Sequence, residues 1–252
     1  MKISRRVWQN YIDDLRKIND AAAKEARSFL QTHDLERDAQ AIIDSCFGLS
    51  TKYGEAATEL AAQMYDALAL AEGVVVPAAV PAETASYGEV AQAINGAKKF
   101  STDIDVIASA VARLVKLAGV DTTMNNALRD GAEWAWSPHG DTCAYCIMLA
   151  SRGWTRASKK DIKNGHAEHI HANCDCIYAI RFDSDTDVEG YNDGVEYREM
   201  YDNADGRGLQ KVNSMRREFY ARNRERINEQ KRSAYEKRKE RESSAAEEID
   251  VG

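Results

Sequence analysis

The sequence has few of the residues that interrupt helices. It contains three prolines and 15 glycines in 252 residues, which excludes collagen-like and broadly disordered chains and favours helix. Its longest apolar stretch, residues 73–82, includes two prolines and is far shorter than the roughly 20 residues a membrane-spanning helix needs. Residues 1–6 lead into polar Gln9 and Asn10 rather than an apolar segment. We therefore expect no signal peptide and assembly in a cytoplasm.

The net charge shows no overall attraction to nucleic acid, but its distribution is uneven. The chain carries 34 basic and 41 acidic residues, a formal charge of −7, and is 44% apolar. Residues 183–205 hold nine acids and one base, a net of −8, whereas residues 216–242 hold eleven bases and six acids, a net of +5. This composition predicts a folded protein with a basic segment behind an acidic one.

The first third of the chain has helical periodicity. Asp34 is a predicted N-cap for a second helix over residues 35–70, so that residues 1–72 form an antiparallel helical hairpin. The first helix is predicted from apolar residues that recur every three or four positions, at Ile3, Val7, Tyr11, Leu15 and Ile18.

Residues 73–86 are predicted to be a linker, because Pro77 and Pro81 prevent a regular helix there. Helices are then expected over residues 102–119, opened by Thr102 and closed by Gly119, and over 122–134. Residues 176–182 have the β-branched and aromatic content of a strand. The predicted units are 1–72, the linker 73–86, a domain over 87–182, and an acidic segment with a charged helical tail over 183–252.

The tail from residue 212 to 242 is strongly charged and has Met215, Phe219 and Ile227 as its apolar anchors. Its bases would let it contact the phosphates of DNA. Its interleaved acids favour a solvated or partner-facing helix instead. Both interpretations stay open.

Four of the five cysteines gather in one region. Cys143 and Cys146 form a C-x-x-C pair, and His171, Cys174 and Cys176 follow about 25 residues later. Such pairs can complete a tetrahedral zinc site, and a closed four-ligand site would be structural rather than catalytic. We predict zinc bound by Cys143, Cys146, His171 and one of the two remaining cysteines. Disulfides and buried thiols are the alternatives, and buried packing is the interpretation of Cys46.

Three enzymatic patterns compete with this interpretation. His166 and Glu168 match the H-x-E of zinc deaminases, but there the C-x-x-C follows the H-x-E, whereas here it comes first. His169, His171 and Asn173 are too compactly spaced for the usual metal-nuclease unit. A Cys–His protease pair involving Cys143 or Cys146 is formally possible, and nothing in the local sequence favours it over metal ligation.

Four segments follow one another in this region: Trp134-Ala-Trp136, Asp141-Thr-Cys143-Ala-Tyr-Cys146, Gly153-Trp154 and His171-Ala-Asn-Cys174-Asp-Cys176. In this order they resemble the MuF-like minor head proteins of tailed bacteriophages. The resemblance covers residues 122–182 and ends in a family motif H-P-x-C-R-C, in which Ala172 and Asp175 stand here for the usual proline and arginine.

The resemblance implies a head morphogenesis protein inside the virion head. Its partners would be the portal protein, the scaffold and the major capsid protein, with assembly in the host cytoplasm and no membrane or small-molecule substrate. Similar chains in actinobacterial phages are labelled capsid maturation proteases, which is the alternative function. The expected fold is mainly α, with a helical N-terminal region, a helical domain carrying a small α+β zinc-knuckle-like element, and a charged C-terminal helix.

Overall fold

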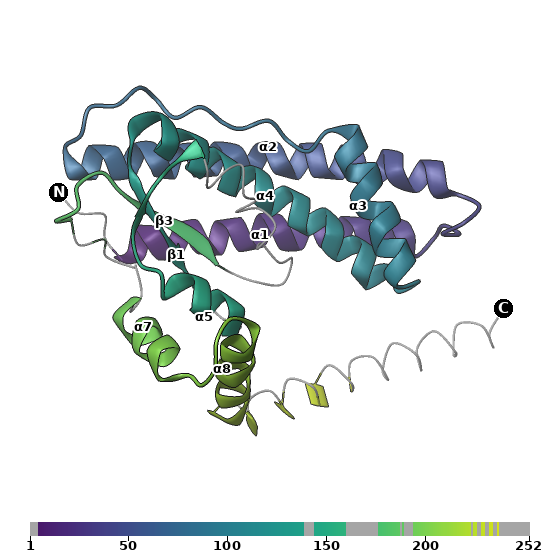
Figure 1. Ribbon diagram of the computed structural model, residues 1–252. Coiled ribbons are helices and arrows are strands. Elements are labelled where there is room, and N and C mark those ends of the chain that lie inside the picture. The colour runs from purple at the N-terminus through teal and green to yellow at the C-terminus, as the bar shows by residue number, and fades with distance from the viewer. Residues whose placement is uncertain are drawn as a thin grey trace.

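The computed structural model is mainly helical and describes residues 5–138, 144–159, 176–186, 188 and 194–222, with single positions or pairs between 224 and 236 (Figure 1). A small sheet and three shorter helices lie at one end of a layer of long helices. The helices are α1 (Arg5–Leu30), α2 (Ala39–Glu72), α3 (Tyr87–Phe100), α4 (Ile104–Asp130), α5 (Ala144–Ala150), α7 (Gly194–Asn203) and α8 (Leu209–Arg222). The strands are β1 (Glu133–Ser137), β2 (Thr155–Arg156) and β3 (Ile177–Arg181).

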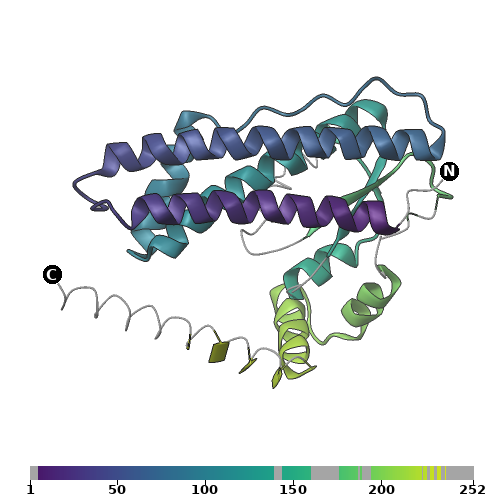
Figure 2. The same cartoon turned by 180° about the vertical axis from the view of Figure 1, so that it is seen from behind.

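Helices α1 and α2 form the predicted antiparallel hairpin and lie side by side along their length (Figure 2). The buried stripe of α1 differs from the predicted one at its start. Val7 is 46% exposed, whereas Trp8 is 2% exposed and packs in the core with Ile12. The indole is the larger apolar group, so the helix turns Trp8 inward and leaves Val7 at the surface.

Asp34 does not cap α2, contrary to the prediction. Its carboxylate accepts hydrogen bonds from the backbone N–H groups of Glu36 and Arg37, at 3.0 and 2.8 Å, and so closes a separate turn. Helix α2 begins after this turn, with Asp38 at its N-cap position. Asp38 makes no side-chain capping bond to α2, since its carboxylate accepts from the backbone N–H of Asp34 at 2.9 Å.

The predicted break at Gly119 is also wrong, since α4 runs without interruption from Ile104 to Asp130. Its N-cap is Asp103, whose carboxylate accepts from the N–H of Asp105 at 2.9 Å, and its C-cap is Gly131, in the left-handed region. Gly119 instead lies against α2, where an added Cβ would be 3.3 Å from the carbonyl oxygen of Ala57. The glycine therefore allows close packing of two helices rather than ending one of them.

Residues 74–86 form an extended strap that runs back along the helical layer from the end of α2 to the start of α3 (Figure 1). Asn126 on α4 holds it from both sides: its Oδ1 accepts from the N–H of Val80, and its Nδ2 donates to the carbonyl of Val80, each at 2.9 Å. Thr122 accepts from the N–H of Ala82 at 2.9 Å. The segment has no regular secondary structure, yet its backbone groups are bonded to α4.

The sheet has the order β2-β1-β3, and both pairs are antiparallel. Strand β3 confirms the strand predicted over 176–182. Trp134, predicted as helix, lies in β1, because Gly131 ends α4 three residues earlier. The sheet packs against the helical layer, and one hydrophobic cluster includes Trp8, Tyr65 and Met124 from the helices together with Trp136 and Ile180 from the strands.

Helix α8 anchors the start of the charged tail. Met215 is 1% exposed and packs with Ala144 and Ile147 of α5, with Phe219 partly buried beside them. The predicted anchors Met215 and Phe219 are thus confirmed, whereas Ile227 lies outside the described residues. Among the described helices, none is both long enough and apolar enough to cross a membrane.

Candidate functional site at the cysteine-bearing end of the sheet

Two of the five predicted zinc ligands lie in the described part of the chain. Cys146 is in the first turn of α5 and is 0% exposed, and Cys176 directly precedes β3 and is 2% exposed. Cys143, His171 and Cys174 lie outside the described residues, as do His139, His166, Glu168, His169 and Asn173 of the alternative patterns.

The pairing of β1 with β3 brings the two cysteine-bearing segments to one end of the sheet. Ser137, the last residue of β1, is opposite Ile177, the first residue of β3. The chain therefore leaves β1 toward α5 at the same place where it enters β3. Cys176 and Cys174 are one and three residues from Ile177, a span of at most about 11 Å along an extended chain.

Both described thiols lie in an apolar setting. Cys146 and Cys176 belong to the same hydrophobic cluster, which also contains a group of packed aromatic rings. The ring of Tyr178 is 4.7 Å from that of Trp134 and 4.8 Å from that of Trp136, measured between centroids. A thiolate is costly in such surroundings unless a cation compensates it. The two side chains can therefore serve either as packed thiols or as ligands of a positively charged metal.

The other end of the β1–β3 pair is held by charge. Arg181 donates from Nε to the Oε2 of Glu133 at 2.7 Å, across the register pair that these two residues form. Its guanidinium also stacks over the ring of Trp154, 4.5 Å from the centroid. This pair fixes the register, and with it the position at which Cys176 precedes the strand.

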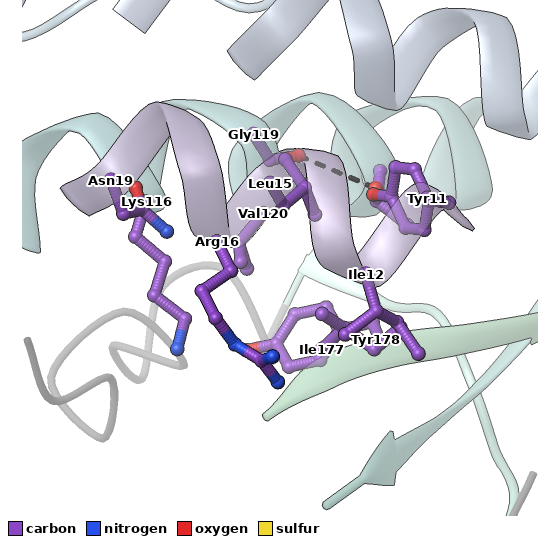
Figure 3. A pocket seen from close by; sticks show the side chains of 11 residues that line it. Tyr11, Ile12, Leu15, Arg16, Asn19, Lys116, Gly119, Val120, Ile177 and Tyr178 are labelled. Carbon is purple, nitrogen blue, oxygen red and sulfur yellow. Dashed lines mark hydrogen bonds between the residues drawn. The ribbon is translucent and has the colours of Figure 1, made fainter. Parts of the chain in front are cut away.

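A small cavity lies beside the sheet, between α1, α4 and β3 (Figure 3). Its volume of about 30 Å³ is of the order of one water molecule, which is too small for a cofactor or a peptide side chain. The hydroxyl of Thr123 donates to the carbonyl of Gly119 at 3.3 Å at this site. Burial raises the pKa of Tyr11, against a smaller lowering by its hydrogen bond with Thr123.

Two polar side chains at this cavity were not anticipated from the sequence. Lys116 is 8% exposed although lysine is rarely buried, and the Oδ1 of Asn19 is buried with no hydrogen-bond partner in the described part of the chain. The position of Lys116 inside the apolar run 114–118 was the available signal for the first. Asn19 carried no comparable signal, because it follows Ile18 at an ordinary polar position of α1.

Cys46 behaves as predicted for a packing residue. It is 1% exposed and lies in a second cluster, which contains Ile42, Val90 and Ile107 from three different helices. Burial raises the pKa of its thiol to about 11, so it is protonated at neutral pH. Substitution of Cys46 therefore serves as a control for substitutions of the cysteines near the sheet.

The described residues do not supply a complete metal site by themselves. Among them, no group of three or more histidine, cysteine, aspartate or glutamate side chains is placed to hold an ion. Any zinc site would thus combine Cys146 or Cys176 with ligands from residues 139–143 and 160–175.

A family model described as VG15 protein matches residues 2–204. The chain belongs to the VG15 protein family. This is a phage virion-gene family, so the chain is a virion-associated phage protein. The match includes the four long helices, the sheet and α7, and it ends before α8. No curated protein and no solved structure matches the chain significantly.

Proposed function

We propose that the chain is a minor head morphogenesis protein of a tailed bacteriophage. It is placed inside the head and associates with the portal protein and the scaffold, and through them with the major capsid protein, while the procapsid forms. The observation that supports this is the VG15 match, which spans both the helical layer and the sheet. The MuF-like arrangement of Trp134, Cys143, Cys146 and the segment 171–176 gives the same assignment from the sequence.

In this proposal the cysteine-bearing end of the sheet holds a structural zinc ion. Cys143, Cys146, His171 and either Cys174 or Cys176 supply soft donors, the set that suits tetrahedral zinc. The ion would tie α5 to the start of β3 and so compensate for the short strands. Two observations support this. Cys146 and Cys176 are buried in one cluster, and the pairing of β1 with β3 places the segments that carry them at the same end of the sheet.

The direct test is co-expression of the chain, bearing an affinity tag, with the portal protein, scaffold and major capsid protein of the same phage. We expect the portal protein or the scaffold to co-purify, and intact masses of all partners to be unchanged. A chain that elutes alone at low and moderate salt would contradict the proposed role. A truncation ending at residue 204 is a useful second form, because it keeps the family-matched region and lacks the charged tail.

The same experiment separates the structural role from the maturation protease. If scaffold or capsid protein is cleaved, and cleavage is lost in Cys143→Ala while the melting curve is retained, the chain is an enzyme and the structural proposal is wrong. Cys46→Ala is the matched control, since this thiol is buried in the other cluster and would leave cleavage unchanged.

A further inference from the structure

A groove lies between α3 and α4, below the end of the strap. Its volume is about 540 Å³, within the range of roughly 300–1,000 Å³ that is common for pockets taking ligands or anchoring side chains. Ala93 of α3 and Leu114, Leu117 and Ala118 of α4 supply its apolar lining, and residues 83–86 of the strap close one end. We call this space the α3–α4 groove.

Apolar surface continues from the groove toward the turn that joins the two helices. Ala93, Gly96 and Phe100 follow one another at helical spacing and therefore share a face of α3. A Cβ at Gly96 would meet no atom within 4 Å, and Phe100 is 92% exposed. Val106, at the start of α4, is 37% exposed. Large apolar side chains left in solvent beside a groove indicate a surface for a partner.

The rim of the groove is mostly acidic. Glu83, Glu89 and Asp121 contribute carboxylates against the single guanidinium of Arg113. The backbone N–H and the hydroxyl of Ser86 both donate to Oε2 of Glu89, and these bonds hold its pKa below the usual value, so it is ionised at neutral pH. The complementary partner is a helix with a narrow apolar stripe flanked by bases.

The C-terminal segment of this chain has that pattern. Three bases, Arg224, Lys231 and Arg238, are spaced seven residues apart, and Ile227 and Ala234 have the same spacing between them. Seven residues make about two helical turns, so all five side chains share one face of a helix. The positions that the structure describes in this segment are helical, which fits this arrangement.

The described tail positions are not seated on their own chain. Arg224, Arg232 and Glu236 are exposed, and α8, which precedes them, lies on the side of the molecule opposite α2 and the strap (Figure 1). The matched family region ends at residue 204, before this segment begins. The tail of one molecule and the α3–α4 groove of another are thus available to each other.

We propose that the α3–α4 groove of one copy binds the basic segment 224–241 of a second copy, and that the segment is helical when bound. Ile227 and Ala234 would meet the apolar lining around Leu117, and the three bases would meet the acidic rim. Because groove and tail are different surfaces, the contact is head-to-tail, and each dimer leaves one groove and one tail free. The proposal depends neither on zinc nor on portal binding.

Self-association of the full chain tests it, measured by sedimentation equilibrium over a wide range of concentrations. We expect a monomer–dimer equilibrium, extending to larger species, that weakens as salt rises because the contact is charged. The groove variant Glu83→Lys/Gln92→Lys and the tail variant Arg224→Glu/Lys231→Glu/Arg238→Glu should each weaken association by roughly tenfold or more. The control Glu36→Lys/Asp20→Asn has the same charge change as the groove variant, at exposed positions elsewhere, and should associate as the unmodified chain does.

Mixing the groove and tail variants gives the sharpest result. Each variant retains one intact surface, so an equal mixture should restore the association that each variant alone has lost. Melting curves confirm that each variant is folded, and the tail variant changes only residues beyond α8. The proposal is overturned if the full chain stays monomeric at low salt, if the variants associate undiminished, or if the mixture remains monomeric. Retention on duplex DNA without self-association, lost in the tail variant, would overturn it in favour of nucleic acid.

Discussion

Arg129 joins the strap to the carboxylate of Asp130 through one guanidinium. It donates to the carbonyl oxygens of Pro77 and Ala78 in the strap, at 2.7 and 3.0 Å, and to both carboxylate oxygens of Asp130 at 2.7 Å. The hydroxyl of Tyr65, on α2, donates to the same carboxylate at 2.9 Å. The side chain of Asp130 is 3% exposed, so its charge depends on these partners.

Removing this guanidinium should destabilise the fold. We expect Arg129→Ala to lower the free energy of unfolding by about 2–3 kcal/mol, since a buried carboxylate and two strap carbonyls lose their charged donor. Chemical denaturation measures the change. Arg37→Ala is the matched control: Arg37 is exposed and its partner Asp38 is not deeply buried, so we expect little change in the free energy of unfolding. Equal decreases in the free energy of unfolding of the two variants would contradict this role of Arg129.

The carboxylate of Asp130 should also make the stability of the fold depend on acid pH. Hydrogen bonds from Arg129, and a smaller effect from Tyr65, lower the pKa of Asp130 below its ordinary 3.8. A lowered folded-state pKa means that its contribution is complete above the ordinary value and is lost as pH falls through the folded value. Asp130→Asn should therefore reduce the loss of melting temperature as the pH falls below about 4. If the melting temperature of Asp130→Asn falls with acid as much as that of the unmodified chain, other carboxylates determine the acid dependence.

At the scale of elements, the contact between α2 and α4 is set by small residues. Gly119 faces Ala57, and Gly54 of α2 faces the strap, where an added Cβ would lie 2.8 Å from Cγ2 of Thr84. Gly48, also on α2, has no atom within 4 Å of an added Cβ. Three helical glycines therefore have different roles, which depend on what each one faces.

This contrast gives a prediction with an internal control. Gly119→Val should destabilise by about 1–3 kcal/mol, because the side chain meets a backbone carbonyl that cannot move without separating the helices. Gly48→Ala should stabilise by roughly 0.5–1 kcal/mol, since it removes helical flexibility at no steric cost. Thermal or urea unfolding measures both. The same sign for both substitutions would refute the proposed packing role of Gly119.

These elements also show what the sequence allowed and where its signals were ambiguous. Periodicity predicted the α1–α2 hairpin, and β-branched and aromatic content predicted β3. A glycine inside a helical pattern can either end the helix or allow a neighbouring helix to pack closely. For Gly119 only the contact with Ala57 distinguishes the two. Pro77 and Pro81 predicted the strap only as a linker. Its attachment to α4 was missed because its bonds come from Thr122, Asn126 and Arg129, some 40 to 50 residues away in sequence.

For the candidate site, local spacing indicated the cysteine pairs, and the burial of Cys146 and Cys176 agrees with either ligation or packing. The sequence could not show that the two cysteine-bearing segments meet at one end of the sheet, because this follows from the pairing of Ser137 with Ile177. Lys116 was missed because a helical stripe containing one lysine is ordinarily interpreted as having that residue at the surface. Its burial follows from the packing of α1 and β3 around α4.

At the scale of the whole molecule, a helical layer carries a small sheet at one end and a charged tail beyond it. Strand β2 has only two residues and β3 has five, so the sheet has little hydrogen bonding of its own. Its stability depends on packing against α1, α2 and α4, and, in the proposed account, on the metal.

The measurement that tests this most directly is the zinc content of the full chain, purified without chelator, together with its melting temperature with and without EDTA. We expect one zinc per chain, absent from Cys143→Ser and retained by Cys46→Ala. We also expect a melting temperature that falls in EDTA by about 2–4 °C for each kcal/mol of metal stabilisation lost. A chain that contains no stoichiometric metal and melts at the same temperature in excess EDTA would contradict the proposed zinc site.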